Sequence, residues 1–325
     1  MDLSQLKRKL FVYSGLLAVR RHSHRKPRVL FWHGVDTSVD AVLCPEVFGV
    51  DSFKRQINYL NRHFEIISIQ EFQHRLEKGT FNGKEVLLTF DDGYANNLHV
   101  VEPILSSLRL PFTVFVSTDN ITTGDYYPTS VNRLVTIASG VEKLSIPILG
   151  KEFMLKSFDD RLSASKQISR ELKSRSLDEV KTIVLELKGN LQSGEWERLK
   201  EQYDCLRPMN WDEVRQLSQQ PGVTIGSHCM WHICCHERQP QEIVREQILS
   251  SKRIIEEQLQ APCDFFAYPN GDYTDFSDSC VNAAYRLGFS AETKNTVDLD
   301  HKGVLPRMAA YTPDLTLFKL LVSSL

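Results

Sequence analysis

The stretch LLTFDDGY, residues 87–94, places two adjacent carboxylates, Asp91 and Asp92, directly after a run of apolar strand formers. Such a run is typical of a strand that is buried on both faces, as the strands of a parallel sheet are. Neighbouring carboxylates repel, and each raises the pKa of the other unless a cation or hydrogen bonds compensate. The stretch therefore predicts a buried strand followed by a charged pair that another group must stabilise.

Strand and helix patterns alternate on both sides of this stretch. Apolar strand candidates separated by helical patterns lie at residues 28–33, 65–69, 85–90, 111–117, 222–228 and 263–268. A last helix is predicted over residues 279–288, with Gly288 at its end. The alternation predicts an α/β fold with a mainly parallel sheet, and about seven strands favour closure into a distorted (β/α) barrel.

The alternation is interrupted over residues 119–205, which are more polar and mostly helical. Within them, residues 144–155 predict a small hairpin that turns at Gly150. We interpret residues 119–205 as a helical insertion within one domain that spans residues 28–325.

The overall composition is that of a globular protein, with 325 residues, 42% hydrophobic residues, 25% charged residues and a formal net charge of −2. This charge balance gives no reason to expect nucleic acid or another polyanion as a partner. Nothing in the sequence indicates an oligomeric state.

The charge is distributed unevenly, because residues 1–28 hold eight Lys and Arg residues against one Asp. The apolar stretch LFVYSGLLAV within them is 10 residues long, too short to cross a bilayer, and no small-residue cleavage site follows it. We predict a basic N-terminal helix over residues 1–27. It either lies against the main domain or makes a peripheral contact with anionic lipid through residues 1–28.

The seven cysteines are odd in number and form no CxxC pair, which favours a reducing compartment. With no convincing secretory signal, we expect the protein in the cytoplasm or at the inner face of the cytoplasmic membrane.

Three predicted strands end in polar motifs: DDGY at residues 91–94, SHCMWH at 227–232 and PNGDY at 269–273. A fourth strand ends at His33. Ligands bind at the carboxyl ends of parallel strands, where the variable loops gather. All four motifs should therefore meet on one face of the sheet.

The spacing of His228 and His232 would place both imidazoles on one side of a turn, where they can hold one metal ion. Taken alone, HxxxH also fits two surface or core histidines. With one Asp as a third ligand, a divalent cation would stabilise the paired carboxylates and leave the other Asp free to act as a base. Mixed nitrogen and oxygen ligands favour Zn²⁺, with Co²⁺, Ni²⁺ and Mn²⁺ as alternatives.

The motifs LLTFDDGY, IGSHCMWH and FFAYPNGDY, in this order, closely resemble those of the polysaccharide deacetylases of carbohydrate esterase family 4. The resemblance covers roughly residues 28–310 and includes VLFWHGV, which is similar to the Tyr-His-Arg-Val box of many bacterial members. It implies that an N-acetylated glycan is the substrate. It also implies that Asp91 is the general base and that Asp92, His228 and His232 are the metal ligands.

The resemblance further implies that a backbone N–H near Asn270 holds the tetrahedral oxyanion and that Tyr268 and Pro269 shape the same wall. Trp231, inside the HxxxH motif, is a candidate for stacking on a sugar ring, and a packing role fits it equally well.

The sequence departs from the family pattern at three places. Cys229 stands where Ser or Thr is usual, and it is interpreted first as a packing residue and second as a ligand or redox-sensitive thiol. Ala267 stands where many relatives carry an arginine that orients the base, a task that Arg307 can take over. A late histidine is missing, so His33 is the candidate acid that protonates the leaving amine, with a backbone-bonded histidine as the alternative.

We therefore expect a metal-dependent N-deacetylase that acts on an amino sugar in a polysaccharide, an oligosaccharide or a lipid-linked glycan intermediate. Two alternatives stay open: a deformylase of a lipid-linked amino sugar, and a non-catalytic carbohydrate-binding relative.

Overall fold

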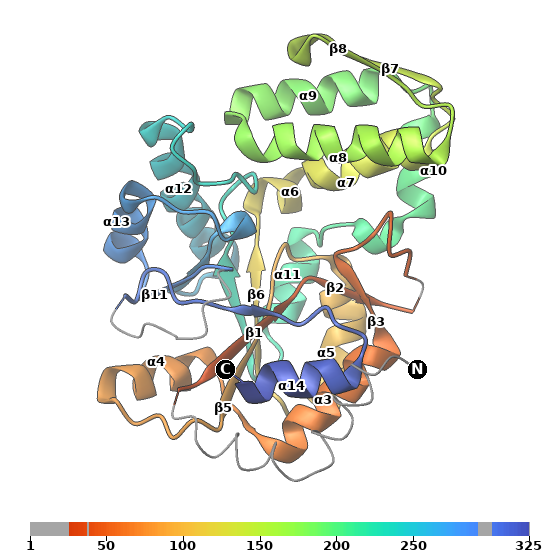
Figure 1. Cartoon of the computed structure of the whole chain (residues 1–325). Helices are drawn as coiled ribbons and strands as arrows, with labels where there is room; N and C mark the ends of the chain where they lie inside the picture. The colour runs from red at the N-terminus through yellow and green to blue at the C-terminus, as the bar shows by residue number, and fades with distance from the viewer. Residues whose placement is uncertain (1–25, 38, 292–300, 325) are drawn as a thin grey trace.

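The computed structural model describes residues 26–37, 39–291 and 301–324 (Figure 1). Its main sheet is built from parallel strands in the order β11 (Leu287–Phe289), β10 (Phe265–Ala267), β9 (Val223–Ser227), β6 (Phe112–Val116), β5 (Glu85–Phe90), β1 (Arg28–Trp32) and β12 (Met308–Ala309). A further strand, β4 (Glu65–Ile66), pairs with the start of β5. The predicted α/β fold, a distorted barrel of about seven parallel strands, is confirmed.

The two edges of this curled sheet are joined by one short segment. Leu305 forms a parallel bridge with Phe289 of β11, and three residues later Met308 pairs with Leu30 of β1. Residues 305–309 therefore reach both edges, and they carry Arg307 between them.

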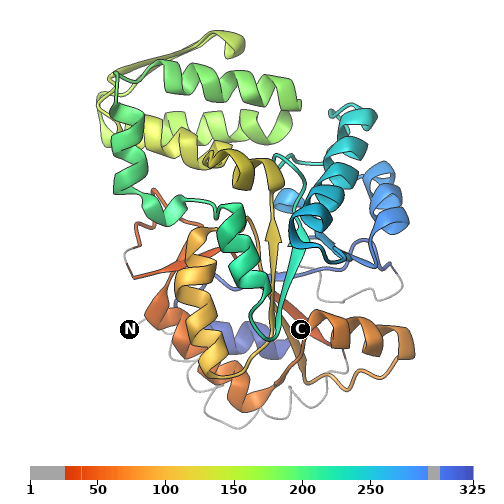
Figure 2. The same ribbon diagram turned by 180° about the vertical axis from the view of Figure 1, so that it is seen from behind.

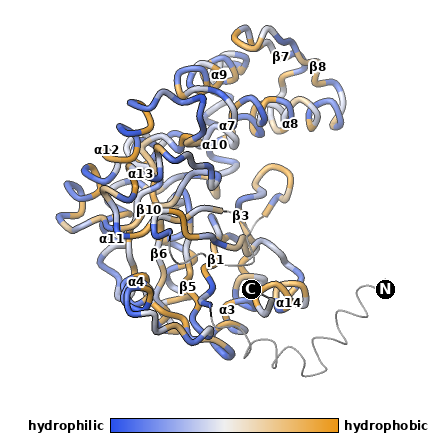
Figure 3. The backbone as a smooth tube through the Cα atoms, turned by 60° about the vertical axis from the view of Figure 1, so that its left-hand side comes forward, coloured by the Kyte–Doolittle hydropathy of each residue, from blue (hydrophilic) through white to orange (hydrophobic). Residues whose placement is uncertain are grey.

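Both faces of the strands are buried, as the apolar sequence of β5 predicts. Alternate strand residues such as Val29, Leu87 and Phe115 form a cluster inside the barrel. Their neighbours along the strands face the surrounding helices. In Figure 3 those helices alternate between hydrophilic and hydrophobic residues, as elements that are half-buried should.

Helices cover the outer face of the sheet. Figure 2, the view from behind, shows α5 and α11 in front of this face. The covering helices are α3 (Val50–His63), α5 (Glu102–Ser107, after a π-helical turn at Asn97–Val101), α11 (Trp211–Ser218), α12 (Gln241–Leu259), α13 (Asp275–Ala284) and α14 (Leu315–Ser324). Another helix, α4 (Ile69–Lys78), ends before Gly79, which adopts φ 63°, a left-handed conformation common where helices end.

The prediction of a helix that ends at Gly288 is wrong. The helix α13 already ends at Ala284, and residues 287–289 form β11. Gly288 is needed because a Cβ at this position would lie 2.0 Å from the carbonyl oxygen of Gly303. The glycine therefore permits a close backbone approach at the closing edge of the barrel.

Residues 119–205 lie beyond the carboxyl end of β6 in Figure 1 and form most of a second hydrophobic core. Their elements, with α6 beginning one residue earlier, are α6 (Thr118–Thr123), α7 (Pro128–Arg133), β7 (Lys143–Ile146), β8 (Lys151–Met154), α8 (Phe158–Ser174), α9 (Leu177–Gly189) and α10 (Glu195–Gln202). The predicted hairpin is confirmed, since β7 and β8 pair antiparallel and Gly150 adopts φ 61° between them. This core also takes in Leu43 and Val47. Val47 begins β3 (Val47–Gly49), which pairs in parallel with β2 (Gly34–Asp36).

The boundaries 28–325 for the domain and 119–205 for the insertion stay predictions. Residues 1–25, which make up most of the predicted basic helix, lie outside the described residues. None of the helices in the described ranges has the length and apolar character that crossing a bilayer requires.

Candidate active site

The strand-end motifs meet around one cleft of about 410 Å³ at the carboxyl ends of the strands. Asp91 and Asp92 follow β5, His33 follows β1, and His232 and Asn270 come from the loops after β9 and β10. The helical segment completes the opposite wall with five residues: Tyr127, Thr129, Arg133, Ser169 and Lys173.

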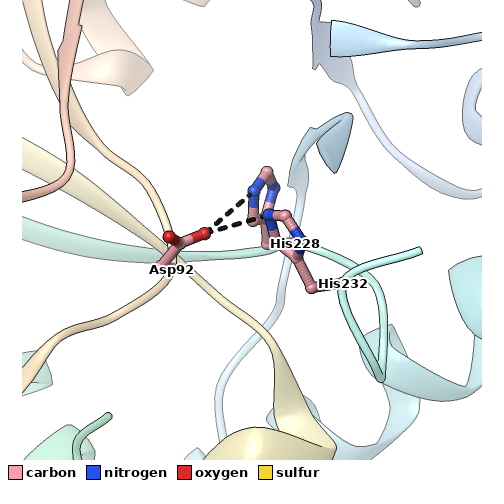
Figure 4. A group of neighbouring side chains, drawn as sticks. All are labelled: Asp92, His228 and His232. Carbon is pink, nitrogen blue, oxygen red and sulfur yellow. Dashed lines mark ion pairs between the residues drawn. The ribbon is translucent and has the colours of Figure 1, made fainter. Parts of the chain in front are cut away.

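Asp92, His228 and His232 form a compact group of potential metal ligands (Figure 4). Oδ1 of Asp92 lies 3.5 Å from Nε2 of His228 and 3.2 Å from Nε2 of His232. One donor atom from each residue lies within 4.8 Å of the other two. Asp92 and His228 are buried, and His232 is half-buried at the edge of the cleft.

The protonation of His228 is set by its second ring nitrogen. Nδ1 lies 2.7 Å from the carbonyl oxygen of Ala267, which can only accept a hydrogen bond. Nδ1 therefore carries a proton, and Nε2 is the nitrogen that faces Asp92. A backbone partner of this kind orients metal-ligating histidines.

Asp91 is held by Arg307. The guanidinium donates two hydrogen bonds to the carboxylate, Nη1 to Oδ1 and Nη2 to Oδ2, each 2.7 Å long. Both residues are buried, and Arg307 also donates to the carbonyl oxygen of Ser290. Burial alone would raise the pKa of Asp91, but the charge and hydrogen bonds of Arg307 outweigh it, so this pKa lies below its usual value.

Arg307 reaches Asp91 because it lies inside the barrel, on the segment that joins the two edges of the sheet. Its guanidinium lies over the rings of Phe31 and Phe115, 4.7 and 5.5 Å from their centroids. The carboxylate of Asp91 is thus paired with a guanidinium that is itself held by a backbone carbonyl and two aromatic rings.

His33 lies on the far side of Asp92, with Nε2 3.8 Å from Oδ2 of the carboxylate. Its side chain is 21% exposed toward the cleft and lies beside the ring of Tyr311, 5.5 Å between centroids. Nδ1 is buried with no hydrogen-bond partner among the described residues. His33 therefore lines the cleft beside Asp92 with part of its ring accessible.

The four residues predicted to form the substrate wall do not all line the same cleft. Asn270 lines the cleft, whereas Tyr268 and Pro269 do not. Tyr268 is fully buried and packs in the outer core, 5.0 Å from Phe266 between ring centroids. Trp231 lines a smaller side pocket next to the cleft and lies under Lys181.

Cys229 is buried in the outer core, with its Sγ 4.0 Å from Sγ of Cys235. Burial raises the pKa of its thiol well above the usual value. Among the described residues it does not belong to the group of potential ligands. This environment suits the packing role.

Sequence reasoning missed one residue that contacts two of the candidate ligands. The hydroxyl of Tyr127 donates to the backbone carbonyl of Asp92, and its ring lies edge-on to His232, 5.0 Å between centroids. The only local signal is its position before Pro128 at the start of a helix. That pattern predicts a helix start and says nothing about the partner of the hydroxyl.

Comparisons with known proteins agree with this geometry. The sequence model of the family described as polysaccharide deacetylase matches residues 78–142 and 187–291, more than half of the chain. The unmatched residues 143–186 fall within the helical segment 119–205. A search of curated proteins gave no match.

Several solved structures share the fold. The Streptococcus pyogenes deacetylase PplD, in complex with acetate, has a TM-score of 0.59 at 16% identity, over 92% of this chain and 98% of its own. IcaB from Ammonifex degensii has a TM-score of 0.56 at 16% identity, over 93% and 97%. BC0361, a polysaccharide deacetylase from Bacillus cereus, has a TM-score of 0.54 at 14% identity, over 92% and 69%. At these identities the likeness shows the fold.

Proposed function

The chain belongs to the polysaccharide deacetylase family, and from this premise we propose that it is a metal-dependent hydrolase that removes the N-acetyl group from an amino sugar of a glycan. One observation carries the proposal. A carboxylate clamped by an arginine, Asp91, lies next to a second carboxylate, Asp92, that faces two histidine nitrogens in one cleft.

The residues fit a divalent metal ion. Oδ1 of Asp92 is buried without a hydrogen-bond partner among the described residues, although two imidazole Nε2 atoms face it. Asp92, His228 and His232 would hold the ion, and this set of one oxygen and two nitrogens suits Zn²⁺ first, with Co²⁺, Ni²⁺ and Mn²⁺ as alternatives. When bound, the ion would supply the Lewis acidity that an amide carbonyl and a water molecule need for hydrolysis.

The side chains around this position divide the proton transfers between them. Asp91 stays ionised beside Arg307 and accepts the proton of the attacking water. His33, on the other side of Asp92, donates a proton to the leaving amine. The backbone near Asn270 forms the wall against which negative charge develops on the former carbonyl oxygen.

The size of the side pocket supports acetyl as the acyl group. This pocket has a volume of about 30 Å³, room for one methyl-sized group, and it shares His232 and Asn270 with the cleft. Its other walls are largely apolar, with Leu172, Leu177 and Val180 among them. A formyl group would leave it empty, whereas the methyl of an acetyl group would fill it.

We expect Val180→Ala to widen the acyl preference, because the substitution removes two methyl groups from the wall of the side pocket. The ratio of kcat/KM for N-propionyl over N-acetyl substrates should rise on the order of tenfold. Val184→Ala is the matched control, since Val184 lies one turn further along α9, is equally buried at 7% exposure and does not line the pocket. Equal ratios in the two variants would contradict the assignment of the pocket.

The proposed function is tested by the acid that is released. The purified chain, supplied with Zn²⁺, is incubated with N-acetylated and N-formylated amino-sugar oligomers and with lipid-linked amino sugars, and acetate and formate are quantified. Acetate release supports the proposal, and release of formate alone would favour the deformylase. Glycan binding without release of either acid would favour a non-catalytic relative. The cytoplasmic location and the contact of residues 1–28 with a membrane stay predictions.

A further inference from the structure

Tyr127 connects the helical segment to two of the proposed metal ligands. It immediately precedes α7, and it is 2% exposed. Its hydroxyl donates to the backbone carbonyl of Asp92. Its ring lies edge-on to the ring of His232, at an angle of 67°, and to the ring of Tyr94, at 72°.

The two ligands that Tyr127 contacts have backbone conformations that need support. Asp92 has φ 73° and His232 has φ 52°, in the left-handed region that residues with a side chain rarely adopt. Such a conformation costs about 1–2 kcal/mol per residue and persists where the surroundings hold it. The hydroxyl of Tyr127 holds the peptide that follows Asp92, and so supports the backbone from which the carboxylate extends.

The other end of α7 is anchored to the loop before β3 and to α8. Arg133 donates from Nε to the carbonyl oxygen of Leu43 and from Nη2 to Glu46, which lies on the wall of the cleft. Asn132 donates to the carbonyl oxygen of Ser165 on α8. The position of Tyr127 is therefore well defined, because it immediately precedes a helix that is held by several hydrogen bonds.

We propose that Tyr127 is a positioning residue of the metal centre, through which the docked helical segment holds Asp92 and His232 in the geometry that binds the ion. This inference rests on the proposed function, because it assumes that these residues bind a metal. It gives residues 119–205 a role in the chemistry beyond covering the cleft. Tyr127 is not one of the potential ligands, so it would act on the ion through Asp92 and His232.

The chain offers a matched control in the preceding residue. Tyr126 is also buried, and its hydroxyl also donates to a backbone carbonyl, that of Lys200, within the helical segment. No described contact joins it to Asp92 or to the histidines. Tyr126→Phe and Tyr127→Phe thus remove the same atom from adjacent positions, and only the second loses a contact with a proposed ligand.

The experiment compares the wild-type chain with both variants by competition titration of Zn²⁺ against a chromogenic chelator and by the visible spectrum of the Co²⁺-loaded protein. Tyr127→Phe should weaken Zn²⁺ affinity about 10- to 100-fold, as loss of a residue that orients ligands does, and should change the Co²⁺ spectrum. Its kcat should fall while KM changes little. Tyr126→Phe should match the wild type in affinity, spectrum and kcat.

A purely structural role of Tyr127 would lower the melting temperature of the metal-free protein and leave metal affinity unchanged. The rise in melting temperature on adding Zn²⁺ reports affinity even for a destabilised variant. An equal rise in wild type and Tyr127→Phe, with equal Co²⁺ spectra, would overturn the inference alone. A wild-type chain that binds no divalent ion would overturn both the inference and the proposed function.

Discussion

Asp91→Asn is expected to lower kcat by about 10²- to 10⁴-fold while the protein still binds its metal ion. An amide at this position cannot accept the proton of the attacking water, and general-base catalysis contributes a factor of this size. The substitution preserves shape, so the loss should appear in kcat and leave KM nearly unchanged. Product release and bound metal are measured on the same preparation.

The neighbouring carboxylate provides the control. Asp92→Asn removes the anionic oxygen that faces His228 and His232, so this variant should lose the metal as well as the activity. Both variants are thus expected to lose turnover, but only Asp92→Asn is expected to lose the metal ion. Activity retained by Asp91→Asn would rule out its role as the base, and metal retained at full affinity by Asp92→Asn would rule out that ligand.

The convergence of these side chains could be predicted because it follows from the geometry of the strands. Parallel strands end on the same face of a sheet, so polar residues placed after β1, β5, β9 and β10 meet whatever the loops between them do. His33, Asp91 and His228 are within one or two residues of their strand ends. Their placement depends on local sequence patterns alone.

The position of Tyr268 could also have been predicted from the same patterns. Ala267 faces the interior of the barrel, and successive strand residues point to opposite faces. Tyr268 must then face the helices, where the structure places it beside Phe266. The family motif suggested a place in the wall of the cleft, and strand alternation favours the outer core.

Tyr127 could not have been predicted, because its role depends on how two distant segments dock. Its partner Asp92 is 35 residues away, and the direction of its ring depends on the packing of α7 against the loop around Glu46. No periodic pattern encodes such a contact. The same holds for Gly288, whose close neighbour Gly303 is brought near only when the barrel closes.

Arg307→Ala should have the second largest effect, because it leaves the buried carboxylate of Asp91 without its cation. Loss of one partner of a buried ion pair costs about 3–5 kcal/mol of folding free energy. Because the base also loses the cation that orients it and keeps it ionised, kcat/KM near neutral pH should fall on the order of 10²-fold. Arg307→Lys keeps the charge but not the two-pronged geometry, and its activity should be intermediate. The melting temperature of each variant shows that the folded protein is being assayed.

The pH profile separates this role of Arg307 from a general loss of structure. Burial raises the pKa of Asp91 and Arg307 lowers it, so removal of the guanidinium must raise this pKa. The base works only when ionised, above its pKa, and the acid limb of kcat/KM should therefore move to higher pH in Arg307→Ala. Stability follows the same sign: the stabilising contribution of the ion pair is present above the unfolded-state pKa of Asp91 and is lost as pH falls through the folded-state pKa. An acid limb that stays in place while kcat/KM drops at every pH would show that Arg307 supports the barrel and does not tune the base.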